Sequence, residues 1–134
     1  MVKTIAVIDG KGGGLGRSVC EVLSKDQSYK LIALGTNANA TANMLKGGAS
    51  DGATGENAIA IMALKVDIIV APISILSANA MMGEVTEKMA LAVGKSAAEK
   101  ILLPLERCSL HVIGVKDMTI KEMVLNLNEM ISAL

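Results

Sequence analysis

The sequence has almost no aromatic residues. Tyr29 is the only one, and the 134 residues include no phenylalanine or tryptophan. Proteins that bind single-stranded nucleic acid stack its bases on aromatic side chains, so this class of protein is excluded. Net charge is also absent, because thirteen basic and thirteen acidic residues cancel. A nucleic-acid binder needs a basic surface, and we therefore expect no nucleic acid among the partners.

Cysteine, histidine and long apolar runs are scarce too. Cys20 and Cys108 are too few for a disulfide framework, and with His111 as the single histidine they cannot form a zinc site. The longest stretch without a charge, residues 68–83, is shorter than the ~20 residues that span a membrane, and no secretory signal opens the chain. We therefore expect a cytoplasmic protein with free thiols and no membrane partner.

The length and the apolar content limit the architecture. A chain of 134 residues makes one domain, residues 1–134, and leaves no room for the two domains of a complete dinucleotide-dependent dehydrogenase. Hydrophobic residues make up 51% of the chain. That is enough for a large aliphatic core, with apolar side chains left over for a partner.

Short apolar runs alternate with amphipathic segments along the chain, which predicts an α/β domain with a mainly parallel sheet. A short edge strand is needed to return the chain between two helices. The link before the final apolar run is too short for a crossover, so that run is expected to be antiparallel. The expected spatial order of strands is residues 50–54, 31–34, 2–8, 67–73, 100–105 and 110–115. The first expected helix starts near residue 15. Further helices are expected at residues 38–46, at residues 56–65 and at residues 75–96, the last with a break at Gly83. The final helix is expected after a capping box formed by Thr119 and Glu122.

The first expected turn is rich in glycine, with five glycines between residues 10 and 16. A strand, a glycine loop and a helix together bind anions, because backbone N–H groups and the helix dipole face the ligand. A tight turn needs only about two glycines. Phosphate or nucleotide binding is therefore favoured over a plain turn. The candidate ligand-binding residues here are Gly10, Gly12, Gly13, Gly14, Leu15 and Gly16.

The spacing of these glycines identifies the class of loop. The strict pattern G-x-G-x-x-G fits no choice of first glycine, whereas G-x-x-x-G-x-G fits through Gly10, Gly14 and Gly16. That spacing resembles the short-chain dehydrogenase/reductase superfamily as far as the strand of residues 67–73. The resemblance implies a nucleotide-binding half with NAD(P) or another nucleotide as ligand. The superfamily's catalytic Tyr-x-x-x-Lys pair is missing, because Tyr29 is followed four positions later by an alanine.

The end of the second strand departs from an NAD site. Such a site has an acid there for the ribose hydroxyls, but this sequence has Thr36 and Asn37. These two could bond a ribose or a phosphate, or they could equally cap the following helix. The P-loop of ATPases fits less well, since Lys11 stands at its first glycine and Arg17 at its lysine.

Other polar residues follow strands and are expected at the same edge, where open parallel sheets bind ligands. Ser74 and Arg107 are further candidate ligand-binding residues. The guanidinium of Arg107 suits a phosphate or carboxylate, although a solvated loop charge is the alternative. Cys108 beside it could be a nucleophile, and Glu56 could act chemically or cap a helix. No residue is assigned a catalytic role.

The chain also resembles a small bacterial family of unknown function along its full length. The matching segments are residues 8–16, 34–37, 52–58 and 104–108. The resemblance implies a Rossmann-like three-layer sandwich, and it implies no activity.

Three functions stay open. The leading one is binding of a nucleotide, dinucleotide or other phosphate-bearing small molecule at the glycine loop. The second is a small enzyme that acts on an anionic substrate with Arg107, Cys108 or Glu56. The third is a structural homo-oligomer without a ligand.

A homo-oligomer, most simply a dimer, is expected in any case. Residues 75–82 carry no charge, so Leu76, Ala80 and Met81 need a cover. A second copy would supply that cover, unless residues 106–109 and the last helix do so within one chain.

Overall fold

The computed structural model describes residues 2–105 and 108–134. Its five strands form one sheet in the order β3-β2-β1-β4-β5, and all neighbours are parallel. This is the order expected for the first five strands, and it makes the chain an α/β protein of the Rossmann-like class. The strands are β1 (Lys3–Asp9), β2 (Tyr29–Gly35), β3 (Asp51–Thr54), β4 (Ile68–Pro72) and β5 (Glu99–Leu103).

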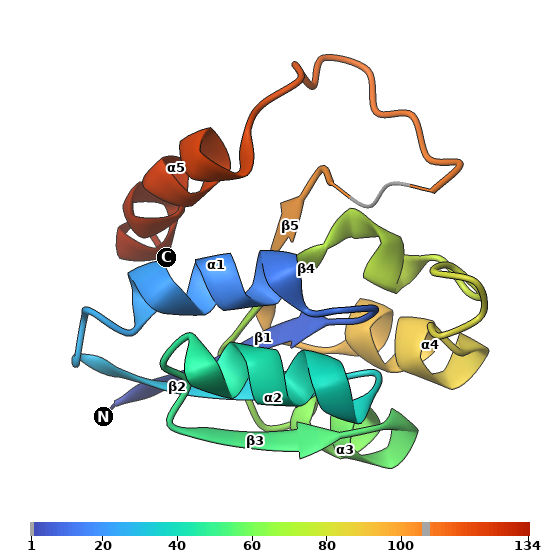
Figure 1. Ribbon diagram of the computed structural model, residues 1–134, viewed down its shortest axis with the longest axis horizontal. Coiled ribbons are helices and arrows are strands. Elements are labelled where there is room, and N and C mark those ends of the chain that lie inside the picture. The colour runs from blue at the N-terminus through green and yellow to red at the C-terminus, as the bar shows by residue number, and fades with distance from the viewer. Residues whose placement is uncertain (1, 106–107) are drawn as a thin grey trace.

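Helices cover both faces of the sheet and give it three layers (Figure 1). The two faces are separated by the alternation of side chains along β1. Ile5 and Val7 belong to one buried cluster, whereas Ala6 and Ile8 belong to the other. The first cluster includes residues of α1 (Gly14–Leu23), α2 (Ala38–Lys46) and α5 (Ile120–Ser132). The second includes residues of α3 (Glu56–Met62) and α4 (Glu87–Lys95).

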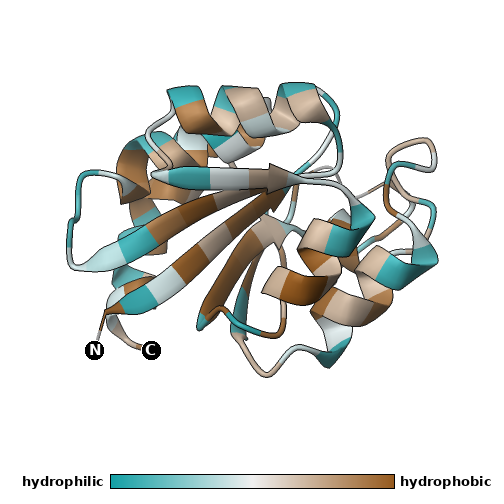
Figure 2. Cartoon of the chain, turned by 90° about the horizontal axis from the view of Figure 1, so that it is seen from below, coloured by the Kyte–Doolittle hydropathy of each residue, from teal (hydrophilic) through white to brown (hydrophobic). Residues whose placement is uncertain are grey.

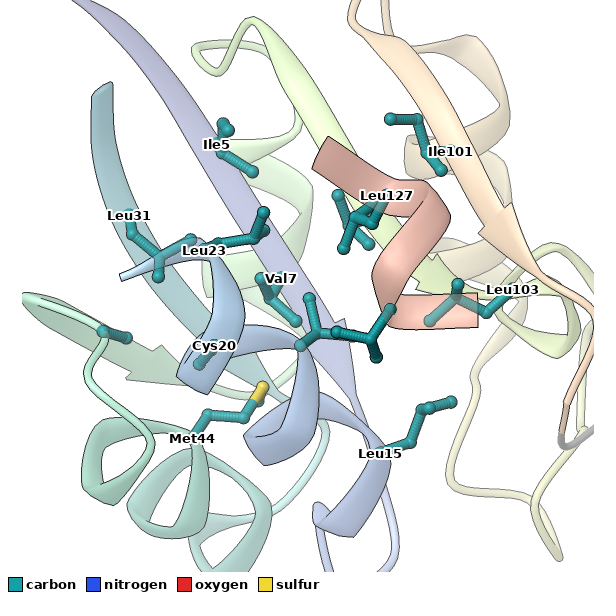
Figure 3. Packing of buried hydrophobic residues seen from close by; sticks show 14 of the residues in the cluster. Ile5, Val7, Leu15, Cys20, Leu23, Leu31, Met44, Ile101, Leu103 and Leu127 are labelled. Atoms are coloured by element: carbon teal, nitrogen blue, oxygen red, sulfur yellow. The ribbon is translucent and has the colours of Figure 1, made fainter. Parts of the chain in front are cut away.

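The apolar runs of the sequence lie in the middle of this arrangement. In Figure 2 the central strands are brown and run between the helices. Figure 3 shows Val7 of β1 facing side chains of α1 and α5, among them Leu23 and Leu127. Each large aliphatic side chain buried in this way contributes about 1.5–3 kcal/mol to stability. Burial on both faces explains why β1 reads as an unbroken apolar run rather than an alternating one.

The antiparallel strand expected at residues 110–115 does not form. The last strand of the sheet is β5, which is parallel to β4. Residues 110–115 lie in turns and irregular structure, in the long connection to α5 (Figure 1). Gly114 has a φ of 88°, and Ile113 is fully exposed. The apolar run therefore does not continue as a strand through Gly114, and none of the strands in the described part of the chain pairs with it.

The long helix expected at residues 75–96 is replaced by a loop and a shorter helix. A 3₁₀ turn spans Ile73–Leu76, and the α-helix starts only at Glu87, where Thr86 caps it. Between them, Asn79, Met81 and Met82 have positive φ values, as does Gly83. This conformation stops a helix, and it costs a non-glycine residue about 1–2 kcal/mol. The residue types of this segment favour a helix, but its backbone does not form one.

The final helix begins where the capping box predicts. Thr119 Oγ1 accepts a hydrogen bond from the Glu122 backbone N–H at 3.2 Å and donates one to the Glu122 side chain at 3.1 Å. Met123, Val124 and Leu127 are buried. Met130 and Leu134, which the sequence pattern places on the same face, are exposed. Among the described residues, no helix has both the length and the apolar composition that crossing a membrane requires.

Candidate functional site

The carboxyl ends of the strands meet at one edge of the sheet. Asp9, Gly35 and Thr54 end β1, β2 and β3 and are paired neighbours across the sheet. The chain stays paired just beyond that point, because the Thr36 N–H donates to the Asp9 carbonyl at 3.0 Å. The loops that follow β1 and β2 are thus held side by side. This is the edge at which ligands bind in open parallel sheets.

Asp9 holds the glycine loop from inside. Its side chain is buried, and its two carboxylate oxygens accept hydrogen bonds from the Gly10 N–H at 2.8 Å and the Gly16 N–H at 2.7 Å. Gly16 lies in the first turn of α1, so a negative charge lies at the positive end of that helix. The side chain of Asp9 therefore braces the loop.

Helix α2 holds the loop from the side. The Asn37 side chain donates to the Lys11 carbonyl at 2.8 Å, and the Asn43 side chain donates to the Gly12 carbonyl at 2.9 Å. Asn37 also caps α2, since its Oδ1 accepts from the Ala40 N–H at 2.9 Å. Helix capping, one of the two roles expected for Asn37, is therefore present. The sequence offered no signal for Asn43.

Three of the loop glycines are closely packed against neighbouring elements. A Cβ added to Gly13 would lie 2.7 Å from the Ala40 Cα, and the φ of Gly13 is 73°. A Cβ on Gly16 would lie 2.9 Å from the Asp9 Cβ. A Cβ on Gly10 would lie 2.6 Å from the Thr36 Oγ1. Neighbouring atoms would have to move at each of these positions.

Gly12 and Gly14 differ from the other three. Both are exposed, and a Cβ added to either would have no atom within 4 Å. Neither has a positive φ. The backbone N–H groups of Gly12, Gly14 and Leu15 donate no hydrogen bond to another described residue. The Leu15 side chain packs in the core, so only its N–H can face a ligand (Figure 3).

Glu84 is a site residue that the sequence analysis missed. Its Oε1 accepts hydrogen bonds from the Lys11 N–H at 2.9 Å, the Thr36 hydroxyl at 2.7 Å and the Asn37 side chain at 2.8 Å. Partial burial works to raise the pKa of Glu84, but these three hydrogen bonds and the charge of Lys11 outweigh it and lower the pKa below its usual value. One signal for Glu84 was available in the sequence, because it is the first charged residue after the uncharged stretch of residues 68–83.

Ser74 lies at the same edge, in the 3₁₀ turn directly after β4. The residue has no exposed surface, and its Oγ has no hydrogen-bond partner among the described residues. A buried hydroxyl without a partner costs about 1–3 kcal/mol, so such groups are rare. The structure therefore places this predicted site residue where expected and leaves its polar atom unused.

The other predicted chemical residues that the structure describes lie on other loops and elements. Arg107 lies outside the described residues. Cys108 is exposed and has a φ of 54°, and Glu56 lies in the first turn of α3, where the helix dipole favours an acid. Burial raises the pKa of Cys20 to about 12, with the charges of Asp9 and Glu21 adding to the effect. No group of residues suited to a metal ion occurs within residues 2–105 and 108–134.

Residues 75–82, for which a second copy of the chain is the expected cover, are partly covered within their own chain. Ala80 and Met81 are buried within their own chain, because the turns of residues 77–85 fold them against β4, η1 (Ile73–Leu76) and α4. Leu76 is partly exposed, and Met82 is 99% exposed. The prediction that Ala80 and Met81 need a second copy is thus wrong, and the exposed side chain is that of Met82.

A surface hollow lies away from this edge. It measures about 740 Å³ and lies between α1 and α5, with Val22, Val124 and Leu125 in its lining. At the glycine loop, open space borders Gly12 and Gly14 among the described residues.

A family model described as a domain of unknown function (DUF3842) matches residues 4–134. The chain belongs to this family. A search of curated proteins and a search of solved structures return no match. Membership in the DUF3842 family agrees with the resemblance to an uncharacterised family. The resemblance of the first half to short-chain dehydrogenase/reductases gains no support from these comparisons.

Proposed function

We propose that this DUF3842 domain binds a nucleotide, a dinucleotide or another phosphate-bearing small molecule at the loop of residues 10–16. The carrying observation is the open space beside Gly12 and Gly14. Nothing in the packing or the backbone conformation requires glycine at either position. A phosphate that approaches the backbone closely does require it, because a side chain there would hold the phosphate away.

The hydrogen-bonding groups around these two glycines support the proposal. Three backbone N–H groups, that of Gly12 in the loop and those of Gly14 and Leu15 in the first turn of α1, have no partner among the described residues. They are donors in a fixed loop, since Asp9, Asn37 and Asn43 hold the backbone around them. The unpartnered Oγ of Ser74 is at the same edge of the sheet. Arg107 stays a predicted anion partner outside the described residues.

A thermal-shift screen tests this function. NAD(H), NADP(H), ATP, GTP, sugar phosphates and inorganic pyrophosphate would each be added to the purified chain. A ligand at about 100 times its Kd adds about 2.7 kcal/mol, which raises the Tm by several degrees for a domain of this size. Gly14→Val should abolish the shift, because the branched side chain would fill the phosphate position.

Gly94→Val is the matched control. Gly94 is also an exposed helical glycine with no atom within 4 Å of an added Cβ, but it lies in α4. This variant should keep the full ligand-induced shift. If no phosphate compound shifts the wild type, or if both variants lose the shift equally, the proposed function is wrong.

We also propose that the chain forms a homo-oligomer, most simply a dimer. The support is the exposure of Met82 and the partial exposure of Leu76 on neighbouring turns. Methionine adapts its shape and is common at interfaces. Light scattering at micromolar concentration should give a mass above 13.8 kDa for the wild type and near 13.8 kDa for Met82→Glu. A wild-type mass of 13.8 kDa would show that the chain is monomeric.

A further inference from the structure

The carboxylate of Glu84 lies where a Rossmann-like fold places its ribose-binding acid. The residues that end β2 are followed by Thr36 and Asn37, and neither is an acid. Glu84 comes from the loop between β4 and α4, yet its Oε1 is 2.7 Å from the Thr36 Oγ1 and 2.8 Å from the Asn37 Nδ2. An acid is thus present at the end of β2, although a distant part of the chain supplies it.

The same contacts leave one oxygen of the carboxylate available. All three hydrogen bonds end on Oε1, and Oε2 accepts none from another described residue. The third donor is the N–H of Lys11, within the glycine loop itself. The acid is therefore fixed next to the loop that would hold the phosphate. A ribose connects the phosphate and the base in any nucleotide, and its hydroxyl groups donate to carboxylates.

The loop that carries Glu84 is held in an unfavourable conformation. Asn79, Met81 and Met82 all have positive φ values, each unfavourable for a non-glycine residue. The Val85 N–H donates to the Ala80 carbonyl at 3.1 Å, and the Asn79 N–H donates to the Val85 carbonyl. Backbone strain of this kind gathers at functional sites, where surrounding structure maintains it. Here the unfavourable backbone lies directly before Glu84, whose carboxylate is hydrogen-bonded to the glycine loop.

We propose that Glu84 accepts a hydrogen bond from the 2′-hydroxyl of a ribose. The ligand of the glycine loop is then a nucleotide with an unsubstituted ribose rather than a 2′-phosphorylated or 2′-deoxy nucleotide. This inference rests on the proposed function. A charged carboxylate attracts a hydroxyl donor and repels a phosphate. It therefore accepts NAD, ADP or GDP and disfavours NADP.

Titration calorimetry on the full chain tests this with pairs of probes that differ only at the 2′ position. The pairs are NAD and NADP, ADP and 2′-deoxy-ADP, and GDP and 2′-deoxy-GDP. For whichever nucleotide binds, loss of the 2′-hydroxyl should weaken binding about tenfold, since a hydrogen bond to a charged group is worth about that much. Addition of the 2′-phosphate should weaken it more. These comparisons use the wild type and need no variant.

Glu84→Gln removes the charge and keeps an oxygen that can accept the three hydrogen bonds. It should reduce the preference for NAD over NADP to within about threefold and weaken binding of ADP or GDP about tenfold. Glu87→Gln is the matched control, because Glu87 is an exposed acid in the first turn of α4. It should change neither value.

The outcomes separate this inference from the proposed function. If nucleotides bind but the two members of each pair differ by less than about threefold, the ribose assignment is wrong and phosphate binding stands. The same holds if only sugar phosphates or pyrophosphate bind. If Glu84→Gln strengthens binding of every phosphate compound equally, the carboxylate blocks the loop instead of recognising a ribose. If no phosphate compound binds, both proposals fail.

Discussion

The glycine loop has two parts that contain the same residue type for different reasons. Gly10, Gly13 and Gly16 are crowded, and any side chain there would meet the backbone or side chains of neighbouring elements. Gly12 and Gly14 border open space. The crowded glycines are explained by the fold alone. The open ones are not, and a run of glycines in a sequence cannot by itself tell the two kinds apart.

The largest expected effect on stability belongs to the crowded part. Gly13→Ala combines a positive φ with a Cβ only 2.7 Å from the Ala40 backbone. Left-handed backbone costs about 1–2 kcal/mol and overpacking about 1–3 kcal/mol, so the free energy of unfolding should fall by about 2–5 kcal/mol. Urea denaturation measures this. A loss below about 0.5 kcal/mol, the range of an ordinary surface substitution, would show that the crowded part is not rigid.

Removal of the buried brace should have the next largest effect. Asp9→Asn weakens the bonds to the Gly10 and Gly16 N–H groups, and charge-assisted bonds of this kind contribute about 1.5–3 kcal/mol. Asp51→Asn is the control, since the exposed Asp51 also bonds the N–H of the next residue, at 2.9 Å. It should change stability by less than about 0.5 kcal/mol in the same urea experiment. Equal losses in the two variants would contradict the bracing role.

Substitutions in the open part should leave stability nearly unchanged and weaken ligand binding instead. Gly12→Ala and Gly14→Ala should each change the free energy of unfolding by less than about 1 kcal/mol, because neither side chain meets an atom and neither φ is positive. Both should nevertheless reduce the Tm shift that a bound nucleotide causes. Melting curves with and without the nucleotide measure both effects. If either variant unfolds readily without ligand, the distinction between the two parts is wrong.

The smallest effect concerns the pH dependence contributed by Glu84. Its pKa is lower in the folded chain than in the unfolded chain, so its stabilising contribution is present above its unfolded pKa of about 4.3. That contribution is lost as the pH falls through the folded pKa. The urea midpoint of the wild type should therefore fall more between pH 7 and pH 3 than that of Glu84→Gln. Parallel profiles for the two proteins would show that the three hydrogen bonds do not favour the charged form.

Much of the fold follows from local patterns in the sequence, and the failures have identifiable causes. The order of the five parallel strands follows from alternation and from the need for crossovers, and Thr119 starts α5 as its capping box predicts. The strand expected at residues 110–115 fails because Gly114 interrupts an apolar run that no neighbour pairs. The helix expected at residues 75–96 fails because Asn79, Met81 and Met82 adopt positive φ, and the Met81 side chain is buried in the second core cluster.

The candidate site divides in the same way. The glycine loop and Ser74 are readable from the sequence, since each follows an apolar strand. Glu84 is not, because its role depends on a hydrogen bond to Thr36, which lies 48 residues away along the chain. Asn43 is not readable from the sequence either, because it lies within a helix and its partner, the Gly12 carbonyl, is far away along the chain. Local patterns predict backbone geometry, whereas the side chains that complete a site come from distant loops.

The central position of β1 has a consequence for synthesis on the ribosome. β1 pairs with β2 on one side and with β4 on the other, and β4 begins only at Ile68. A nascent chain that has emerged as far as α3 can form β1, β2 and β3, but the second edge of β1 still lacks its partner. That edge carries Ile5, Ala6 and Val7, an apolar template for pairing with other chains. β4 covers this edge only after residues 68–72 have emerged from the ribosome, so the edge stays open to other chains until then.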